Sequence, residues 1–382
     1  MLLALLLSLS NLNSESVDQQ VLGLLNKMNL SERVAQLQHA TLDGLVIKDG
    51  QVTHDSLVSV LGKQGIGVVS FPLGASADRI ATCVNSVQRY LRTETRLKVP
   101  AIVVSECLHG PLAVGATIFP QAIAQGSTWN PDLIQSMSSV IAREAISLGA
   151  SQCLSPLFDL ARDPRYGRVE ECFGECPTLV SQMGVAWVNG AQGKDVWTRG
   201  LAMDKIACTT KHFAGYSVPA AGINLGPASL GEREMRSLYL PPFEAAVKSA
   251  HVMSVMPSYN EVDGVPAHGN PWLLNTVLRK EWGFPGYVYS DWGGVEMLHS
   301  FHHVVASVDE AGVLALRSGV DVEAPGPEGF SHLEEAVKNH ELDPKILNLS
   351  VSRVLREKFL AGLMGGSRPE ASPALRKPDA SP

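Results

Sequence analysis

Residues 206–213 read IACTTKHF, an apolar and partly β-branched run that ends close to two basic side chains. Further runs of the same kind lie at residues 65–71, 101–106, 153–160, 252–259, 286–291 and 319–323. Short, almost continuously apolar runs are typical of strands that are buried on both faces of a parallel sheet. They place this chain in the α/β class.

Segments with the apolar spacing of helices separate these runs, at residues 78–92, 132–148, 177–189, 230–250 and 344–360. A strand followed by a helix, repeated along the chain, predicts a parallel sheet. The number of repeats over roughly 300 residues favours a TIM-type (β/α)8 barrel in which one strand is still to be assigned. Residues 122–127 are the candidate for that strand. An open doubly wound sheet would bring a glycine-rich phosphate loop after the first strand. Residues 70–76, SFPLGAS, lack that glycine spacing.

Composition and the chain ends narrow the function class. The 382 residues include 31 basic and 38 acidic side chains, a net charge of −7, which argues against a nucleic-acid partner. Residues 1–10, MLLALLLSLS, are too few for a membrane span. They have the length of a signal-peptide core but lack a basic flank and a small-residue cleavage site. We expect residues 1–16 to be a signal peptide or unstructured, which favours a secreted or periplasmic protein and leaves the cytoplasm open.

The other end and the cysteines add two expectations. Residues 367–382 are rich in Pro, Ser and Ala and predict a disordered tail, so that the folded domain covers residues 17–366. The six cysteines contain no C-x-x-C pair and no ligand spacing for a metal. They are interpreted as buried small hydrophobic residues, although two of them could pair in an exported protein.

Polar side chains end nearly every predicted strand. They are Glu106, Asp159, Lys211 with His212, Tyr259, Asp291, and Asp321 with Glu323. A barrel brings the carboxyl ends of its strands to one face, where active sites of this fold are built. Each residue alone is equally compatible with a solvated strand end, but the repetition favours a catalytic face.

The most informative of these ends is Asp291, in the stretch VYSDWGG at residues 288–294. A carboxylate at a strand end can act as nucleophile, general base or metal ligand, whereas an isolated Ser-Asp-Trp would more simply be a helix N-cap. Lys211 and His212 can donate hydrogen bonds to hydroxyl groups, and Tyr259 and Trp292 supply flat apolar walls. Such a mixture suits a polyhydroxylated ligand, because sugars offer both hydroxyls and C–H faces.

Six motifs together resemble one known family. They read ECLHG (106–110), FPQAIAQGSTWN (119–130), RDPRYGRVEECFGE (162–175), KHFAGY (211–216), MPSYNEVDGVP (256–266) and YSDWGGV (289–295). In this order they resemble the N-terminal barrel of glycoside hydrolase family 3, the β-glucosidase and β-xylosidase group, from about residue 17 to about residue 364. Without the resemblance, the loop at 162–168 with its following glutamates would equally be a set of mutually satisfied ion pairs.

The resemblance implies a role for each matching residue. Asp291 matches the family nucleophile of a retaining hydrolysis of terminal β-linked sugars. The residues that match the glycone subsite, with an aromatic beside the nucleophile, are Glu106, Arg162, Lys211, His212, Met256, Tyr259 and Trp292. Lys211 and Arg162 are expected to favour the charged form of Asp291. No metal or organic cofactor is implied, and the expected partner is a β-linked oligosaccharide or glycoside.

Two questions stay open at this point. The family's general acid/base lies in a second, α/β-sandwich domain, and only 18 residues follow Met364. That group is therefore expected to be absent, supplied by another chain, or replaced by a barrel residue such as Glu171 or Glu323. The alternative to an active glycosidase is a catalytically impaired fragment or a non-catalytic sugar-binding barrel. Glu106 stands where glucosidases of the family often have Asp, and its extra methylene favours β-xylosides over β-glucosides. Tyr216 replaces the second His of the N-acetylglucosaminidase motif, which disfavours that activity.

Overall fold

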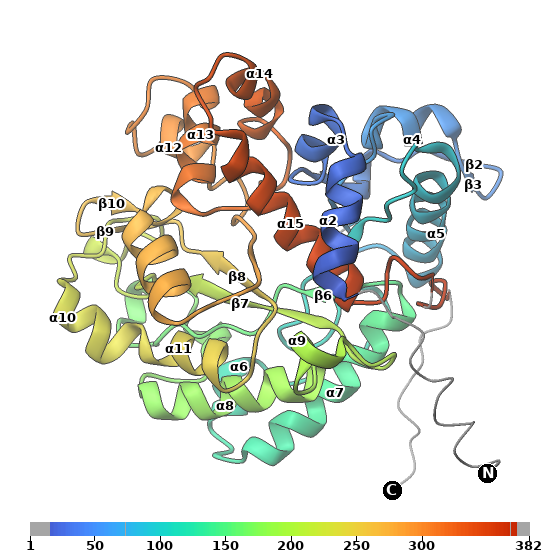
Figure 1. Ribbon diagram of the computed structural model, residues 1–382. Coiled ribbons are helices and arrows are strands. Elements are labelled where there is room, and N and C mark those ends of the chain that lie inside the picture. The colour runs from blue at the N-terminus through green and yellow to red at the C-terminus, as the bar shows by residue number, and fades with distance from the viewer. Residues whose placement is uncertain (1–15, 73, 367, 373–382) are drawn as a thin grey trace, which may run out of the picture.

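The computed structural model describes residues 16–72, 74–366 and 368–372. Its centre is a curled sheet of seven strands in the order β1-β4-β5-β6-β7-β8-β11, and all neighbouring strands are parallel (Figure 1). The strands are β1 (His39–Thr41), β4 (Val68–Ser70), β5 (Ile102–Ser105), β6 (Gln152–Cys153), β7 (Ala207–Phe213), β8 (Ser254–Pro257) and β11 (Tyr287–Val288). The spatial order of the strands follows their order in the chain. Because the strands are parallel, the polar residues that follow them gather at one edge of the sheet.

The predicted run at residues 319–323 is not a regular strand, but it lies where one would be. Val322 forms a parallel bridge with Tyr289 beyond β11, and Glu323 forms one with Gln38 beside β1. This segment therefore touches both outer strands of the curled sheet.

The candidate strand at residues 122–127 is wrong, because α6 (Ala122–Gly126) is a short helix. Gly126 packs so closely on the backbone of Phe173 that an added Cβ would lie 1.9 Å from the Phe173 carbonyl oxygen. The strand that the sequence analysis missed is β1, whose three residues form no apolar run.

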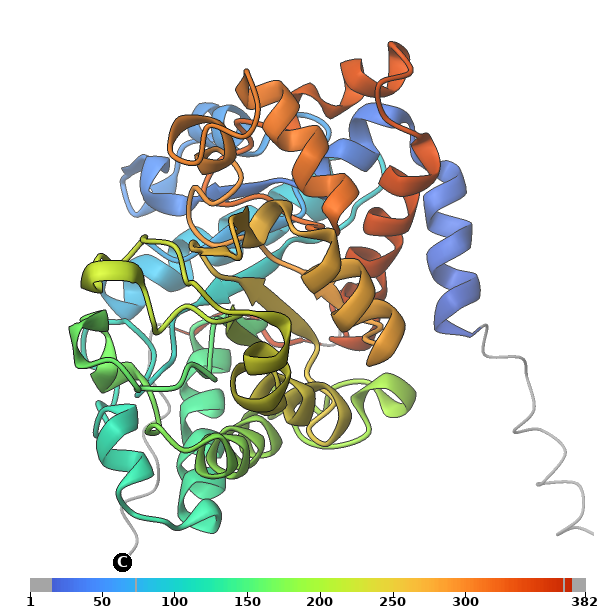
Figure 2. The same ribbon diagram turned by 90° about the vertical axis from the view of Figure 1, so that its left-hand side faces the viewer.

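Helices cover the outside of the sheet, and four of the five predicted helices are confirmed (Figures 1 and 2). These four are α5 (Ala77–Glu94), α7 (Pro131–Ser147), α8 (Pro177–Ala191) and α15 (Pro344–Leu360). The predicted helix at 230–250 is broken into α10 (Glu232–Glu234), a π-helical turn at Met235–Tyr239 and α11 (Pro241–Lys248). Pro241 accounts for the break, since proline is tolerated in the first turn of a helix but not in its interior.

The remaining elements are shorter or lie at the periphery. The helices are α2 (Val17–Lys27), α3 (Leu30–Ala35), α4 (His54–Leu61), α9 (Val196–Arg199), α12 (Met297–Ser300), α13 (Val308–Ser318), α14 (Leu333–Lys338) and a π-helix at Trp272–Glu281. The other strands pair as hairpins, β2 (Ile47–Lys48) with β3 (Gln51–Val52) and β9 (Glu261–Val262) with β10 (Val265–Pro266). Short 3-10 turns include Val169–Glu171 and Ala267–Gly269.

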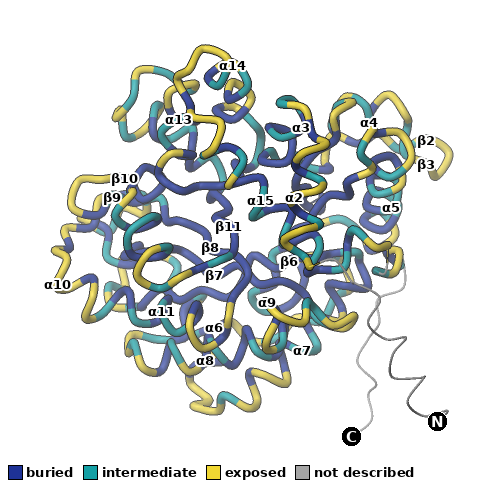
Figure 3. The backbone as a smooth tube through the Cα atoms, viewed as in Figure 1, coloured by how far each residue is buried: buried dark blue, intermediate teal, exposed yellow. Residues whose placement is uncertain are grey.

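Burial follows this architecture (Figure 3). All residues of β4, β5, β7 and β8 are buried, as expected for strands covered on both faces, whereas exposed residues concentrate on the outer helices and loops. Five cysteines are buried as predicted, Cys176 is exposed, and all six are unpaired.

The chain ends depart in part from expectation. The signal-like residues 1–15 and the tail residues 367 and 373–382 lie outside the described residues. Residues 368–372, assigned to the tail, are held on the protein: the Arg368 Nε donates to the Ala361 carbonyl at 2.7 Å, and Asn85 exchanges two hydrogen bonds with the backbone of Ala371. In the described part of the chain, none of the helices is both long and apolar enough to cross a membrane.

Candidate active site

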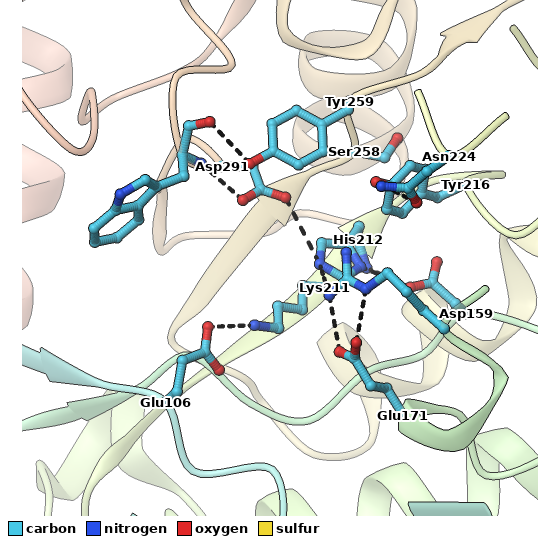
Figure 4. A network of polar contacts seen from close by, with 12 residues as sticks. Glu106, Asp159, Glu171, Lys211, His212, Tyr216, Asn224, Ser258, Tyr259 and Asp291 are labelled. Carbon is cyan, nitrogen blue, oxygen red and sulfur yellow. Dashed lines mark hydrogen bonds and ion pairs between the residues drawn. The ribbon is translucent and has the colours of Figure 1, made fainter. Parts of the chain in front are cut away.

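Asp291 lies just beyond β11, at the carboxyl edge of the sheet (Figure 4). Its Oδ1 accepts the Trp292 N–H at 2.7 Å, while its Oδ2 is buried, has no hydrogen-bond partner and lies 3.7 Å from the Nε2 of His212. Burial raises the pKa of Asp291, and the cation of Lys211 is the largest influence in the opposite direction. One carboxylate oxygen is thus fixed by a hydrogen bond, and the other has no hydrogen-bond partner.

Lys211 lies in β7 and reaches Glu106, which follows β5. The Lys211 Nζ donates to the Glu106 Oε1 at 2.6 Å, and the Glu106 Oε2 is buried without a partner. The two side chains are 4% and 29% exposed, so this ion pair is nearly enclosed on the lysine side and open to a ligand on the glutamate side. Both residues are brought together as the sequence predicts.

His212 is fixed by Asp159, which follows β6. Its Nδ1 lies 2.7 Å from the Asp159 Oδ2, and its backbone N–H donates to the same oxygen at 3.2 Å. Burial lowers the pKa of His212 well below its usual value and raises that of Asp159 to about 7. We assign a neutral imidazole that donates from Nδ1, which leaves Nε2 as an acceptor facing the site.

The arginine that contacts this network of side chains is Arg168, in the same motif as the predicted Arg162. Arg162 is exposed, whereas the Nη2 of Arg168 lies 3.3 Å from the His212 Nε2 and its guanidinium binds both oxygens of Glu171 at 2.8 Å. Arg168, together with Lys211, also lowers the pKa of Asp291, a role the sequence analysis gave to Arg162. Both arginines belong to one motif, and the ion pair with Glu171 distinguishes Arg168 in the structure.

The two predicted aromatic residues, Tyr259 and Trp292, lie beside Asp291 (Figure 4). The Tyr259 hydroxyl donates to the Trp292 carbonyl at 2.8 Å, and the Trp292 ring meets His39 edge-on with ring centres 5.2 Å apart. Met256 is 2% exposed, within β8, and forms part of the core beneath these residues.

A cavity of about 240 Å³ opens beside Asp291 and contains three of the predicted residues, Glu106, Asp291 and Trp292. Its remaining lining is Ser70, Phe71, Val104, Ser105, Leu112 and Leu154. A larger groove of about 670 Å³ lies over α13 and α14 and contains none of the predicted site residues. The smaller cavity is therefore the candidate ligand site.

Asp321 and Glu323 do not join this network, although the sequence analysis put them on the same face. Asp321 is fully buried between Arg279 and Arg353, at 2.7 and 2.8 Å. The Glu323 carboxylate accepts the backbone N–H groups of Gly329 and Phe330, and burial raises its pKa to about 8. Both carboxylates have structural partners. Within the described ranges, no group of three His, Cys, Asp or Glu side chains is arranged to hold a metal ion.

Two residues that contact the predicted site residues, and that sequence reasoning did not single out, are Arg168 and His268. The imidazole of His268 is buried, and its Nε2 accepts the backbone N–H of Asp291 at 3.0 Å. His268 lies two residues beyond the predicted motif at 256–266 and follows no predicted strand, so no periodic signal marked it.

Comparisons with known proteins place this chain in one family. The model of the glycosyl hydrolase family 3 N-terminal domain matches residues 29–357. A β-xylosidase of Formosa agariphila is 41% identical over 281 residues, which are 70% of this chain and 39% of that protein. A periplasmic β-glucosidase of Salmonella typhimurium is 30% identical over 360 residues, 92% of this chain and 43% of that protein.

Solved structures extend the likeness to the fold. A β-glucosidase from Erythrobacter marinus superposes with a TM-score of 0.86 at 38% identity, covering 95% of this chain and 47% of that one. This chain thus spans less than half the length of each of these relatives. The match to the family model and the order of its motifs together show that the chain belongs to glycosyl hydrolase family 3, in the region of its N-terminal domain.

Proposed function

We propose that this chain binds the terminal sugar of a β-linked xyloside or glucoside and attacks it with Asp291 in a retaining hydrolysis. The observation that carries this proposal is the Asp291 carboxylate, which lines the same cavity as Glu106 and has one oxygen, Oδ2, without a hydrogen-bond partner. A nucleophilic carboxylate needs an oxygen that is not held by hydrogen bonds and a fixed orientation. Oδ2 meets the first requirement, and the Trp292 N–H on Oδ1 meets the second.

The chemistry follows from the groups around that oxygen. Oδ2 attacks the anomeric carbon as the bond to the leaving group breaks, and water then releases the sugar from the covalent glycosyl-enzyme. The attacking form is the carboxylate, so the positive charges of Lys211 and Arg168 support the reaction by opposing the effect of burial on the pKa of Asp291.

Sugar recognition is assigned to the groups with free hydrogen-bonding capacity. The Glu106 Oε2 accepts from sugar hydroxyls, and Lys211, with one N–H engaged by Glu106, keeps donors for the same or a neighbouring hydroxyl. The cavity walls beside Glu106 include Phe71, Leu112 and Leu154. Apolar walls and a long acidic side chain favour a pentose without a hydroxymethyl group, and we propose a preference for β-xylosides.

The general acid/base is not assigned to the described acidic residues near the site. Glu171 is bound on both oxygens by Arg168, and Glu323 is bound on both oxygens by backbone N–H groups. Because a general acid must reach the glycosidic oxygen, we propose that this group comes from outside residues 16–372.

We further propose that the curled sheet closes into an eight-stranded (β/α)8 barrel. Support comes from the bridges of Val322 and Glu323 to the two outer strands of the sheet. The proposed domain covers residues 17–366 with the segment 368–372 docked on it. Export to the periplasm or the outside is supported by the apolar residues 1–10 and by the name of the Salmonella relative.

Trapping the glycosyl-enzyme tests the proposed function. The chain is incubated with dinitrophenyl 2-deoxy-2-fluoro-β-xyloside and then digested for mass spectrometry. We expect a covalent sugar on the peptide that contains Asp291, and no adduct in the Asp291→Asn variant. Binding of xylose or glucose without any adduct would instead identify a sugar-binding barrel that lacks catalysis.

A further inference from the structure

The backbone stops pairing with the sheet at Asp291, the proposed nucleophile. The N–H of Tyr289 donates to Val255 at 3.0 Å, and the N–H of Ser290 donates to Val322 at 2.9 Å. The next N–H, that of Asp291, is buried and has no backbone carbonyl as a partner; it donates to the Nε2 of His268 at 3.0 Å. Since a buried N–H needs a partner, an imidazole here takes the place of a strand carbonyl.

His268 is suited to accept this hydrogen bond. Its side chain is buried, and burial, together with the nearby His302, lowers the pKa of His268 to about 3. A neutral imidazole has a lone pair on one ring nitrogen, whereas an imidazolium has none. The Nε2 of His268 is therefore an acceptor over the whole pH range in which a glycosidase of this kind would work.

The ring of His268 is held on two sides. It stacks on Tyr259 with ring centres 6.3 Å apart and an interplanar angle of 28°. On another side lies Gly294, where an added Cβ would approach the imidazole to 2.3 Å. Glycine at 294 thus makes room for the ring, and the ring connects Tyr259 to the backbone of Asp291.

We infer that His268 is a positioning residue for the nucleophile, an inference that rests on the proposed function of Asp291. His268 fixes the main chain of Asp291, the Trp292 N–H fixes Oδ1, and Oδ2 is then the one carboxylate oxygen without a protein hydrogen bond. A shift of the backbone here moves the attacking oxygen directly, and small displacements of reacting atoms lower rates strongly.

Two variants separate this role from a contribution to stability. His268→Phe keeps a flat ring against Tyr259 and removes the acceptor, whereas His268→Gln offers an amide oxygen close to the position of Nε2. We expect His268→Phe to slow labelling by the 2-fluoro xyloside by about ten- to a hundredfold, with the Kd for xylose changed less than about twofold. His268→Gln should recover most of the labelling rate, even if its melting temperature stays below that of the unmodified chain.

Amide hydrogen exchange makes the test independent of activity. The peptide containing residues 289–292 should exchange faster in His268→Phe than in His268→Gln, provided that both variants are folded by circular dichroism. Labelling of His268→Phe at the unmodified rate, or equal exchange in the two variants, would overturn the inference. If the unmodified chain takes no label at Asp291, the proposed function fails, and the exchange difference alone decides whether His268 holds this backbone.

Discussion

Replacing Lys211 with Met tests how the site keeps Asp291, the proposed nucleophile, charged. Lys211 is the largest influence that lowers the pKa of Asp291, against the effect of burial. Its loss raises the pKa of Asp291 further, so the fraction of carboxylate at a given pH falls. We therefore expect the acid limb of the labelling rate, measured with the 2-fluoro xyloside from pH 4 to 8, to move to higher pH in Lys211→Met.

The same change removes one partner of the ion pair with Glu106. Breaking a buried pair in this way costs ~3–5 kcal/mol. Water reaches Glu106, whose side chain is 29% exposed against 4% for Lys211, so we expect the lower end of that range. A loss of ~3 kcal/mol corresponds to a melting temperature lower by roughly 5–10 °C.

The pH dependence of this loss has a definite sign. A carboxyl whose pKa is raised in the folded protein binds protons more readily than in the unfolded chain, so its contribution to stability falls as the pH rises. Lys211→Met enlarges that effect at Asp291, and the loss of stability should be greater at pH 7 than at pH 4.

The double variant Lys211→Met, Glu106→Gln provides the matched control. It removes the uncompensated charge, and urea unfolding should show it to be more stable than Lys211→Met alone. An acid limb that stays in place or moves to lower pH would refute the assigned role of Lys211, and a double variant less stable than the single one would refute the ion-pair argument.

Three further predictions concern substrate choice, the source of the general acid and a buried ion-pair cluster. Glu106→Asp should raise the ratio of kcat/KM for aryl β-glucosides over β-xylosides by roughly tenfold, and an unchanged ratio would contradict the steric argument. The 382-residue chain should react with dinitrophenyl β-xyloside, and azide should accelerate its turnover. It should hydrolyse xylobiose slowly, because protonation of a poor leaving group contributes ~10²–10⁴-fold. Fast xylobiose hydrolysis with a bell-shaped pH profile would show an acid/base among its own residues. Asp321→Asn should lower the free energy of unfolding, measured in urea, by ~3 kcal/mol, because it leaves Arg279 and Arg353 without their buried carboxylate. The same loss in a variant at an exposed position, such as Asp55→Asn, would refute this explanation.

The part of the fold that could be predicted from sequence is the part with a strong periodic signal. The predicted bounds of α15 match the structure at both ends. At its start, Asp343 caps the helix and Pro344 is its first residue. β1 escaped because a three-residue strand with His and Thr has no apolar run, and residues 122–127 were mistaken for a strand because a short apolar stretch does not distinguish strand from helix.

The site shows the same division between strand ends and loops. Glu106, Lys211 and Asp291 lie together because parallel neighbouring strands deliver their carboxyl ends to one edge, which is a consequence of topology alone. Arg168 reaches the site through a loop whose path depends on its own ion pair with Glu171, so the motif contained the right residue type without indicating which arginine turns inward.

Asp321 shows the limit of the strand-end rule. It follows an apolar run as Asp291 does, yet two arginines from separate helical segments neutralise it inside the protein. What distinguishes the two carboxylates is their partners: Asp321 has a charged partner on each oxygen, and Asp291 keeps one oxygen without any. A buried carboxylate with an unpaired oxygen is costly to retain in a stable fold. The unpaired Oδ2 of Asp291, in a residue that lines the cavity, therefore supports the role proposed for it, whereas the two ion pairs of Asp321 support a structural role.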